Sequence, residues 1–146
     1  MKALFILLLG GMMMGSSLAA DMTPAAPAAV DTEMQAARAQ IAKKDWPAAV
    51  KTLEPYTKVN PKSADGFNLL GYSYRHLKRY DESLVAYKQA LTLDPKHRGA
   101  HEYIGMAYIQ MGQPAKAREH LAALDKICTF SCEEYRDLKK ALASVK

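Results

Sequence analysis

The sequence has little of what defines several protein classes. Of its 146 residues only two are cysteines and 8% are aromatic, while 49% are hydrophobic and 24% are charged. This composition excludes a disulfide-dense toxin, a collagen and a disordered acidic tail, and it favours one small soluble domain. Lysine and arginine outnumber aspartate and glutamate by 20 to 15, but the basic residues form no long block. No nucleic-acid partner is therefore predicted.

The one long hydrophobic run lies at the start of the chain. Ala3–Met14 follows the positive start Met1-Lys2, and Ser17-Leu18-Ala19 offers small residues at the −3 and −1 positions of a cleavage site. The run is shorter than the roughly 20 apolar residues of a membrane-spanning helix. We predict a signal peptide over residues 1–19, cleaved near Ala19, and a periplasmic or secreted protein with no stable membrane insertion after cleavage. An uncleaved anchor is the alternative.

Residues 20–29 are rich in alanine and proline, and they show no apolar periodicity. This composition is typical of a flexible or polyproline-like tether. We therefore expect the folded domain to span residues 30–146.

Within this domain the chain repeats with a period of 34 residues. The middle copy has the order Phe67-x2-Leu70-Gly71-x2-Tyr74, followed by Ser83-x3-Tyr87-x2-Ala90 and Pro95. The same positions of the next copy hold His101, Ile104, Gly105, Tyr108, Ala117, Leu121, Leu124 and Thr129. Those of the previous copy hold Glu33, Ala36, Ala37, Gln40, Ala49, Leu53, Tyr56 and Pro61. The pattern resembles the tetratricopeptide repeat (TPR), with departures at His101 and Thr129 and a degenerate opening helix in the first copy.

The resemblance implies an all-α fold, a TPR helix-turn-helix solenoid of three repeats with a C-terminal capping helix. The repeats are expected at about 30–63, 64–97 and 98–131, and the capping helix at about 132–145. Gly71 and Gly105 are expected where two helices of a repeat cross closely, facing the small residues Ala49, Ser83 and Ala117. Helix starts are predicted at Asp45 and Asp81, as N-caps of second helices, and at the S-x-x-E capping box of Ser131 and Glu134.

In TPR proteins the first helices of the repeats line a concave groove for a peptide or a partner helix, and the resemblance implies such a groove here. The groove-facing positions hold Arg38, Asn68, Tyr72, Arg75, His76, Glu102, Met106 and Gln110, beside Met34, Ile41 and Ile109. Arg38 or Arg75 could reach a carboxylate of an extended peptide. The alternative is that half of these residues only solvate an exposed helix face.

Some TPR proteins bind the acidic C-terminus of heat-shock chaperones through a clamp of lysine, asparagine and arginine side chains. The clamp positions of this chain hold Met34, Arg38, Leu69, Gly99 and Tyr103. The two-carboxylate clamp is therefore absent from the sequence.

Cys128 and Cys132 span the predicted turn before the capping helix. An even number of cysteines in an exported protein favours a disulfide, and a turn lets the two Cα atoms approach. The alternative is thiol-redox exchange or copper binding, because a helix N-terminus would stabilise the Cys132 thiolate. The C-x3-C tail also resembles the tails of small exported bacterial TPR proteins.

His97 and His101 have the i, i+4 spacing of paired metal ligands, but nothing at ligand spacing completes a set. We expect both to serve packing, with no metal and no cofactor. No nucleophile elbow, phosphate loop or zincin motif is found either, so no enzyme is predicted.

We therefore predict a non-enzymatic scaffold that binds another exported or membrane-associated protein. One alternative is a thiol-redox or copper-handling accessory protein acting through Cys128 and Cys132. A structural subunit of an envelope complex, using the convex face, is another.

Overall fold

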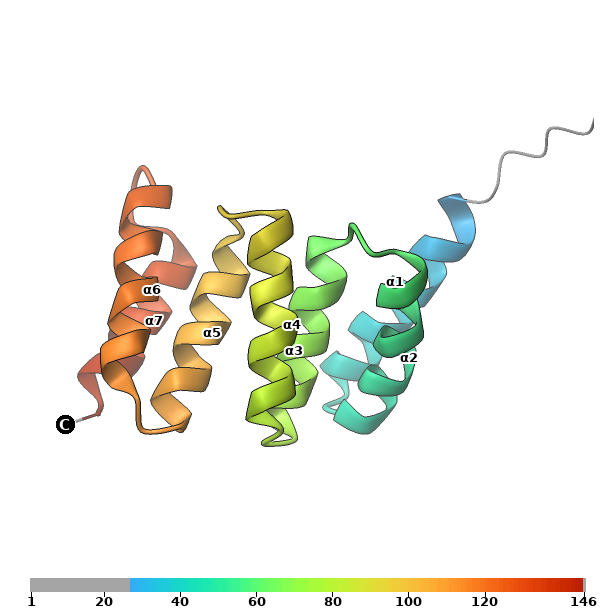
Figure 1. Cartoon of the computed structure of the whole chain (residues 1–146), viewed down its shortest axis with the longest axis horizontal. Helices are drawn as coiled ribbons and strands as arrows, with labels where there is room; N and C mark the ends of the chain where they lie inside the picture. Colours follow the sequence, from blue (N-terminus) through green and yellow to red (C-terminus); the bar gives the residue numbers. More distant parts are fainter. Residues whose placement is uncertain (1–26, 146) are drawn as a thin grey trace, which may run out of the picture.

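The computed structural model describes residues 27–145, with side chains from residue 32 onward. This part of the chain forms seven α-helices and no strand. They are α1 (Pro27–Ala42), α2 (Trp46–Val59), α3 (Ala64–His76), α4 (Tyr80–Leu93), α5 (Arg98–Gln110), α6 (Pro114–Ile127) and α7 (Glu133–Ala143). Consecutive helices form hairpins that stand in a row, from α1 at one end to α7 at the other (Figure 1). The predicted all-α solenoid is confirmed.

The start of α1 differs from the sequence prediction. The predicted signal peptide, residues 1–19, and residues 20–26 of the predicted tether lie outside the described residues. The helix begins at Pro27, so residues 27–29 belong to α1 and not to a tether. Proline is tolerated in the first helical turn because the amide hydrogen that it lacks would have no partner within the helix.

The turn inside each hairpin has the same backbone geometry in all three copies. Lys44, Lys78 and Gly112 stand 34 residues apart and have φ angles of 58°, 60° and 70°. The amide after each of them donates to a carbonyl five residues earlier: Asp45 to Gln40, Arg79 to Tyr74 and Gln113 to Tyr108. These are Schellman endings, which favour glycine because a Cβ atom is strained in the left-handed region.

The two predicted N-caps have different outcomes. The carboxylate of Asp45 accepts a hydrogen bond from the Ala48 amide at 3.2 Å, which confirms it as the cap of α2. The prediction for Asp81 is wrong, because α4 begins at Tyr80, directly after the Schellman turn, with Arg79 at the cap position. Asp81 lies instead in the first turn of α4, where the helix dipole favours a carboxylate.

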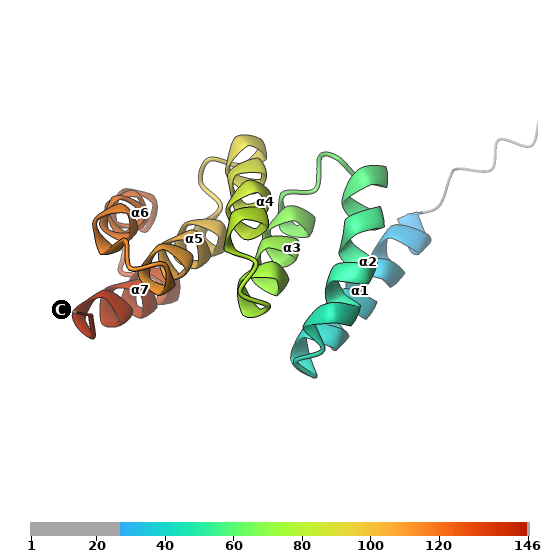
Figure 2. The ribbon, with the colours of Figure 1, turned by 60° about the horizontal axis from the view of Figure 1, so that its bottom comes forward.

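The helices lie in two layers. The first helices α1, α3 and α5 contact one another in sequence and α7 continues the series, whereas α2, α4 and α6 do not pack against each other. Figure 2 shows α4 and α6 above α3, α5 and α7. We call the outward surface of α1, α3, α5 and α7 the first-helix face. The second helices stand apart, so space remains between them.

The two glycines of the repeat pattern allow close approach, although not to the same kind of neighbour. A Cβ atom on Gly71 would lie 2.7 Å from the ring of Tyr87 on α4. A Cβ atom on Gly105 would lie 2.6 Å from Leu138 on α7. The capping helix, rather than the second helix of the same repeat, therefore packs against Gly105. Leu138 is fully buried, so α7 completes the core of the third repeat.

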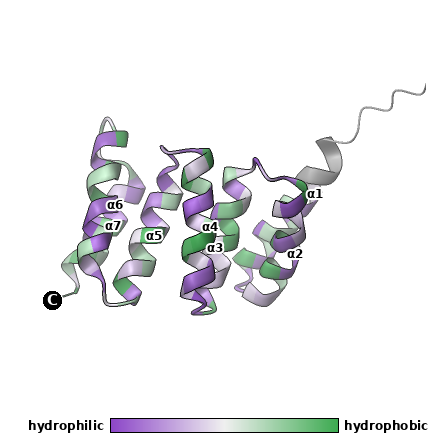
Figure 3. Ribbon diagram, viewed as in Figure 1, coloured by the Kyte–Doolittle hydropathy of each residue, from purple (hydrophilic) through white to green (hydrophobic). Residues whose placement is uncertain are grey.

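Polar and apolar residues occur on the same helices (Figure 3), as expected for helices with one buried side. Within residues 27–145, no helix is both long and apolar enough to cross a membrane.

Candidate partner-binding face

The predicted groove residues all lie on first helices. Arg38 is on α1, Asn68, Tyr72, Arg75 and His76 are on α3, and Glu102, Met106 and Gln110 are on α5. Of these, Tyr72, Arg75 and His76 contact one another. Met106 borders a cavity beside α7, and Gln110 is exposed at the end of α5. The predicted residues therefore converge on α3 rather than forming an even row.

Four aromatic side chains gather at this centre, and we call them the ring cluster: Trp46, Tyr72, His76 and Tyr103. Trp46 stacks on His76 with ring centres 4.0 Å apart, and Tyr72 lies 4.5 Å from His76 and 4.8 Å from Tyr103. Trp46 and Tyr103 were not among the predicted groove residues. One signal for Trp46 was available, because it is the only tryptophan of the chain.

Arg75 lies within the ring cluster and is only 8% exposed. Its guanidinium carbon is 5.2 Å from the centre of the Tyr72 ring and 5.9 Å from that of Tyr103. Nη2 lies 3.4 Å from Nε2 of His76, but Nε has no hydrogen-bond partner. Among residues 32–145, no carboxylate pairs with this charge. Cation–π contacts offset only part of the desolvation of a buried, unpaired charge, so Arg75 is available to an anion.

The titratable neighbours of Arg75 do not supply this anion. Burial, with help from Arg75 and Lys44, lowers the pKa of His76 below its usual value. Burial, followed by the nearby Glu102, raises the pKa of Tyr103 to about 12. His76 and Tyr103 are thus neutral near pH 7. Asn68 adds a buried Oδ1 that has no donor.

The side of the first-helix face next to α7 is acidic. A cavity of about 230 Å³ is lined by Gly99, Glu102, Tyr103, Glu133, Glu134 and Asp137. Burial, followed by repulsion from Asp137 and Glu134, raises the pKa of Glu102 to about 7. Glu102 is therefore only partly ionised near neutral pH. The face is positive at its centre and negative toward its C-terminal end.

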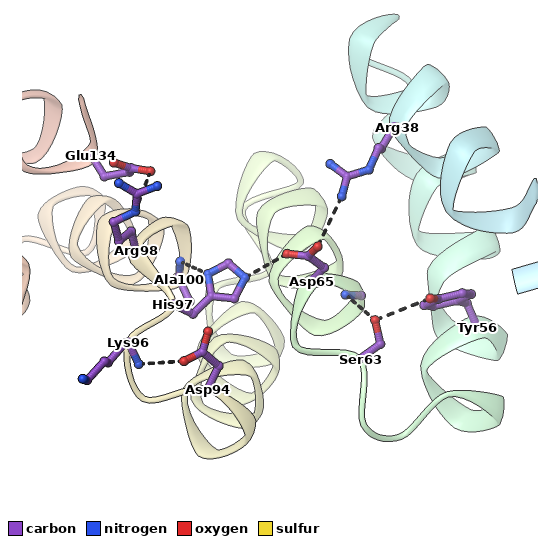
Figure 4. A network of polar contacts seen from close by, with 11 residues as sticks. Arg38, Tyr56, Ser63, Asp65, Asp94, Lys96, His97, Arg98, Ala100 and Glu134 are labelled. Carbon is purple, nitrogen blue, oxygen red and sulfur yellow. Dashed lines mark hydrogen bonds and ion pairs between the residues drawn. The ribbon is translucent and has the colours of Figure 1, made fainter. Parts of the chain in front are cut away.

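One edge of the face is crossed by a polar network that joins three first helices (Figure 4). Arg38 on α1 lies 3.5 Å from the Asp65 carboxylate on α3, and Nε2 of His97 at the start of α5 lies 3.0 Å from the same group. Nδ1 of His97 accepts a hydrogen bond from the Ala100 amide, so the ring proton is on Nε2 and is donated to Asp65. Arg38 therefore already has a carboxylate partner, unlike Arg75.

Two family models described as tetratricopeptide repeat match residues 64–97 and 100–126. The chain is a TPR protein. The matched segments are the middle and third hairpins, and the first hairpin has the degenerate opening helix. A search of curated proteins found no significant match to the sequence.

Solved TPR structures share the fold. The TPR2B domain of yeast Sti1, solved as a pHsp70 complex, is 22% identical, with a TM-score of 0.73 over 78% of this chain and 93% of that one. The Yersinia enterocolitica type III secretion translocator chaperone SycD is 16% identical, with a TM-score of 0.73 over 80% and 89% of the two chains. A mutant of MamA is 26% identical, with a TM-score of 0.64 over 70% and 75%.

The C-x3-C tail of this TPR protein forms a closed loop. Cys128 and Cys132 are bonded to each other, with Cα atoms 5.7 Å apart. Cys132 occupies the N-cap position of α7 without a side-chain cap bond, so the capping box predicted from Ser131 is wrong. The bond between the cysteines holds Cys132 at this position.

The histidines separate into two arrangements. His97 belongs to the edge network, whereas Nδ1 of His101 faces Nδ1 of His120 on α6 at 3.1 Å. Nε2 of His101 donates to the Pro95 carbonyl at 3.0 Å. Burial, followed by the charge of His101, lowers the pKa of His120 to about 4. The described part of the chain has no group of three or more His, Cys, Asp or Glu residues arranged for a metal ion.

Proposed function

We propose that this TPR protein is a non-enzymatic scaffold that binds a peptide or helix of a partner protein on the first-helix face, at the ring cluster. The observation that carries the proposal is the buried guanidinium of Arg75, which has no counter-ion among the described residues. A carboxylate of the partner would pair with it in a charge-assisted hydrogen bond. The rings of Tyr72 and Tyr103 would pack against the rest of the bound segment.

The similar folds support a protein partner. The Sti1 domain is described in a complex with pHsp70, and SycD is described as a translocator chaperone. Because these chains are less than 25% identical to this one, they support the class of partner and not its identity.

We further propose that the protein is exported and that its partner is another exported or membrane-associated protein. The apolar run and cleavage site near Ala19 support this, as does the Cys128–Cys132 bond, because disulfides persist in oxidising compartments. Mass spectrometry of the protein from a periplasmic fraction tests the proposal. A mature chain starting near Ala20 is expected, and an intact Met1 in the cytoplasmic fraction would contradict export.

The binding proposal can be tested with a photo-crosslinking residue at Tyr72 in living cells. We expect a crosslinked partner at Tyr72 that disappears when Arg75→Gln is introduced. Arg118 is an exposed arginine on α6, away from the first-helix face, so Arg118→Gln is the matched control and should leave the crosslink unchanged. A crosslink that survives Arg75→Gln would contradict the proposal, provided that circular dichroism finds both variants folded.

The alternative function, thiol-redox or copper handling, is supported by the position of Cys132 at the N-terminus of α7. It predicts that reduced Cys132 titrates well below the ordinary thiol pKa of about 8.5, or that the reduced pair retains Cu(I) through dialysis. The scaffold proposal predicts instead that Cys128→Ser/Cys132→Ser loses about 2 kcal/mol or less and still binds the partner. Thiolate titration of one reduced sample separates the two.

A further inference from the structure

A second open surface lies on the other side of α3, between the helices of the middle repeat and away from the ring cluster. A cleft of about 580 Å³ is lined mostly by apolar side chains and has acidic residues at its border. The lining is Phe67, Leu70, Tyr74, Asp81, Glu82, Val85, Ala86 and Gln89. Val85 is 69% exposed, which is unusual for a large aliphatic side chain in a cleft. The surface between α3 and α4 is therefore apolar and open to solvent.

The 34-residue period explains why this cleft is open. Phe67 and Ala86 correspond to His101 and His120 in the third repeat. There the two imidazoles face each other across α5 and α6, with ring centres 5.3 Å apart. The small Ala86 side chain leaves in the middle repeat the space that the His120 ring takes in the third.

A complementary feature projects from the other end of the molecule. Phe130 is 90% exposed at the tip of the loop that the Cys128–Cys132 bond closes. Nη1 of Arg136 donates to the Ser131 carbonyl at 2.6 Å and holds the loop further. An aromatic side chain on a short, restrained loop loses little conformational freedom on binding. Such side chains are typical anchors of interfaces when they fill a pocket.

The charges around the two features are opposite. At the border of the cleft, Asp81 makes no ion pair with any described residue, while Glu82 pairs with Arg79. Beside Phe130 lie Lys126, in the last turn of α6, and Arg136, and neither forms an ion pair with the described residues. The acidic border thus complements the basic base of the loop.

We propose that Phe130 of one molecule inserts into the cleft between α3 and α4 of a second copy. The two patches lie on different repeats of one chain, so the contact is heterologous. A heterologous contact adds molecules head to tail, forming rings or open chains. The ring cluster takes no part in it, so each copy in the assembly keeps its first-helix face free. This self-association is independent of the proposed function.

Sedimentation velocity of the purified, oxidised protein tests the proposal. The wild type is expected to form dimers and larger species as its concentration rises. Phe130→Ala removes the anchor, and Ala86→His fills the cleft with the residue that the third repeat has at this position. Each variant should move the midpoint of association to at least tenfold higher concentration. Val59→Ala, at another exposed aliphatic residue, is the matched control and should change nothing.

Mixing the two variants is the decisive arm. Phe130→Ala keeps the cleft and Ala86→His keeps the anchor, so an equimolar mixture should form a 1:1 dimer and nothing larger. Asp81→Lys lies on the exposed border and keeps the interior intact; it should weaken association by reversing the charge. A wild type that remains monomeric would overturn the proposal and leave the cleft to a different protein. Association that persists in Phe130→Ala, or a mixture that stays monomeric, would overturn it as well.

Discussion

The middle and third repeats share a backbone but differ in what their surfaces offer. On the first-helix face, Tyr72, Arg75 and His76 of the middle repeat correspond to Met106, Ile109 and Gln110 of the third. Arg75 is a buried cation, whereas Ile109 is partly buried among apolar neighbours of the same cluster as Met106. The charge that can anchor a partner therefore occurs once, at the middle of the row of hairpins.

The positions that do not differ between the two repeats are those that hold the backbones together. Gly71 and Gly105 both admit a close neighbour, and Tyr74 and Tyr108 are both buried. The turn residues Lys78 and Gly112 adopt the same left-handed conformation despite their different side chains. The comparison thus separates residues that build the repeat from residues that give one repeat its own surface.

The largest effect that we predict separates the two glycines. Gly71→Leu should destabilise the protein by about 3 kcal/mol or more, because the Tyr87 ring is fully buried and cannot move aside. Gly105→Leu should cost less, since its neighbour Leu138 is a flexible side chain on the terminal helix. Urea unfolding followed by circular dichroism measures both. Equal losses would mean that α7 is as rigid a neighbour as α4.

A smaller effect concerns the histidine pair, which only the third repeat has. The pKa of His120 is about 4 in the folded protein and about 6.5 when unfolded, so the unfolded chain binds the proton more strongly. The resulting stability is complete above pH 6.5 and is lost as the pH falls toward 4. Allowing for solvent screening of the half-buried ring, the loss is about 1–2 kcal/mol.

His120→Gln tests this pH dependence, because glutamine does not titrate. Carboxylates titrate in the same range in both proteins, so the quantity to compare is the difference in unfolding free energy between wild type and variant. This difference should change between pH 7 and pH 4. A constant difference would show that His120 does not sense the proton.

The smallest effect lies in the turns. Lys78→Gly should stabilise the protein by about 0.5–1 kcal/mol, because glycine at this position relieves the strain of a φ of 60°. Gly112→Lys should cost a similar amount, and thermal melts of the two variants measure the pair. A Lys78→Gly variant that melts below the wild type would mean that the lysine side chain contributes a contact that outweighs the strain.

The residues that the sequence could predict are those whose role depends on spacing along one chain segment. The 34-residue period was enough to place Gly71, and the C-x3-C spacing was enough to pair Cys128 with Cys132. The same period would have placed Arg79, not Asp81, opposite Asp45, so that error came from reading residue type before position.

The rest depends on contacts across helices, which spacing does not reveal. Trp46 stacks on His76 from a different helix, and Tyr103 reaches Tyr72 from the next repeat. His101 and His120 face each other although 19 residues separate them. That Arg75 would be buried without a carboxylate was equally out of reach, because burial depends on all of these neighbours together.

The most direct test of the central claim, that Arg75 is held ready for a partner and does not serve the fold, is the unfolding free energy of Arg75→Met in urea. Methionine fills the same space without a charge, and replacing a buried, poorly compensated charge with an apolar side chain is often neutral or stabilising. We predict that the variant, in the absence of any partner, is as stable as the wild type or up to about 2 kcal/mol more stable. A loss of more than about 2 kcal/mol would instead make Arg75 a structural residue and contradict the account.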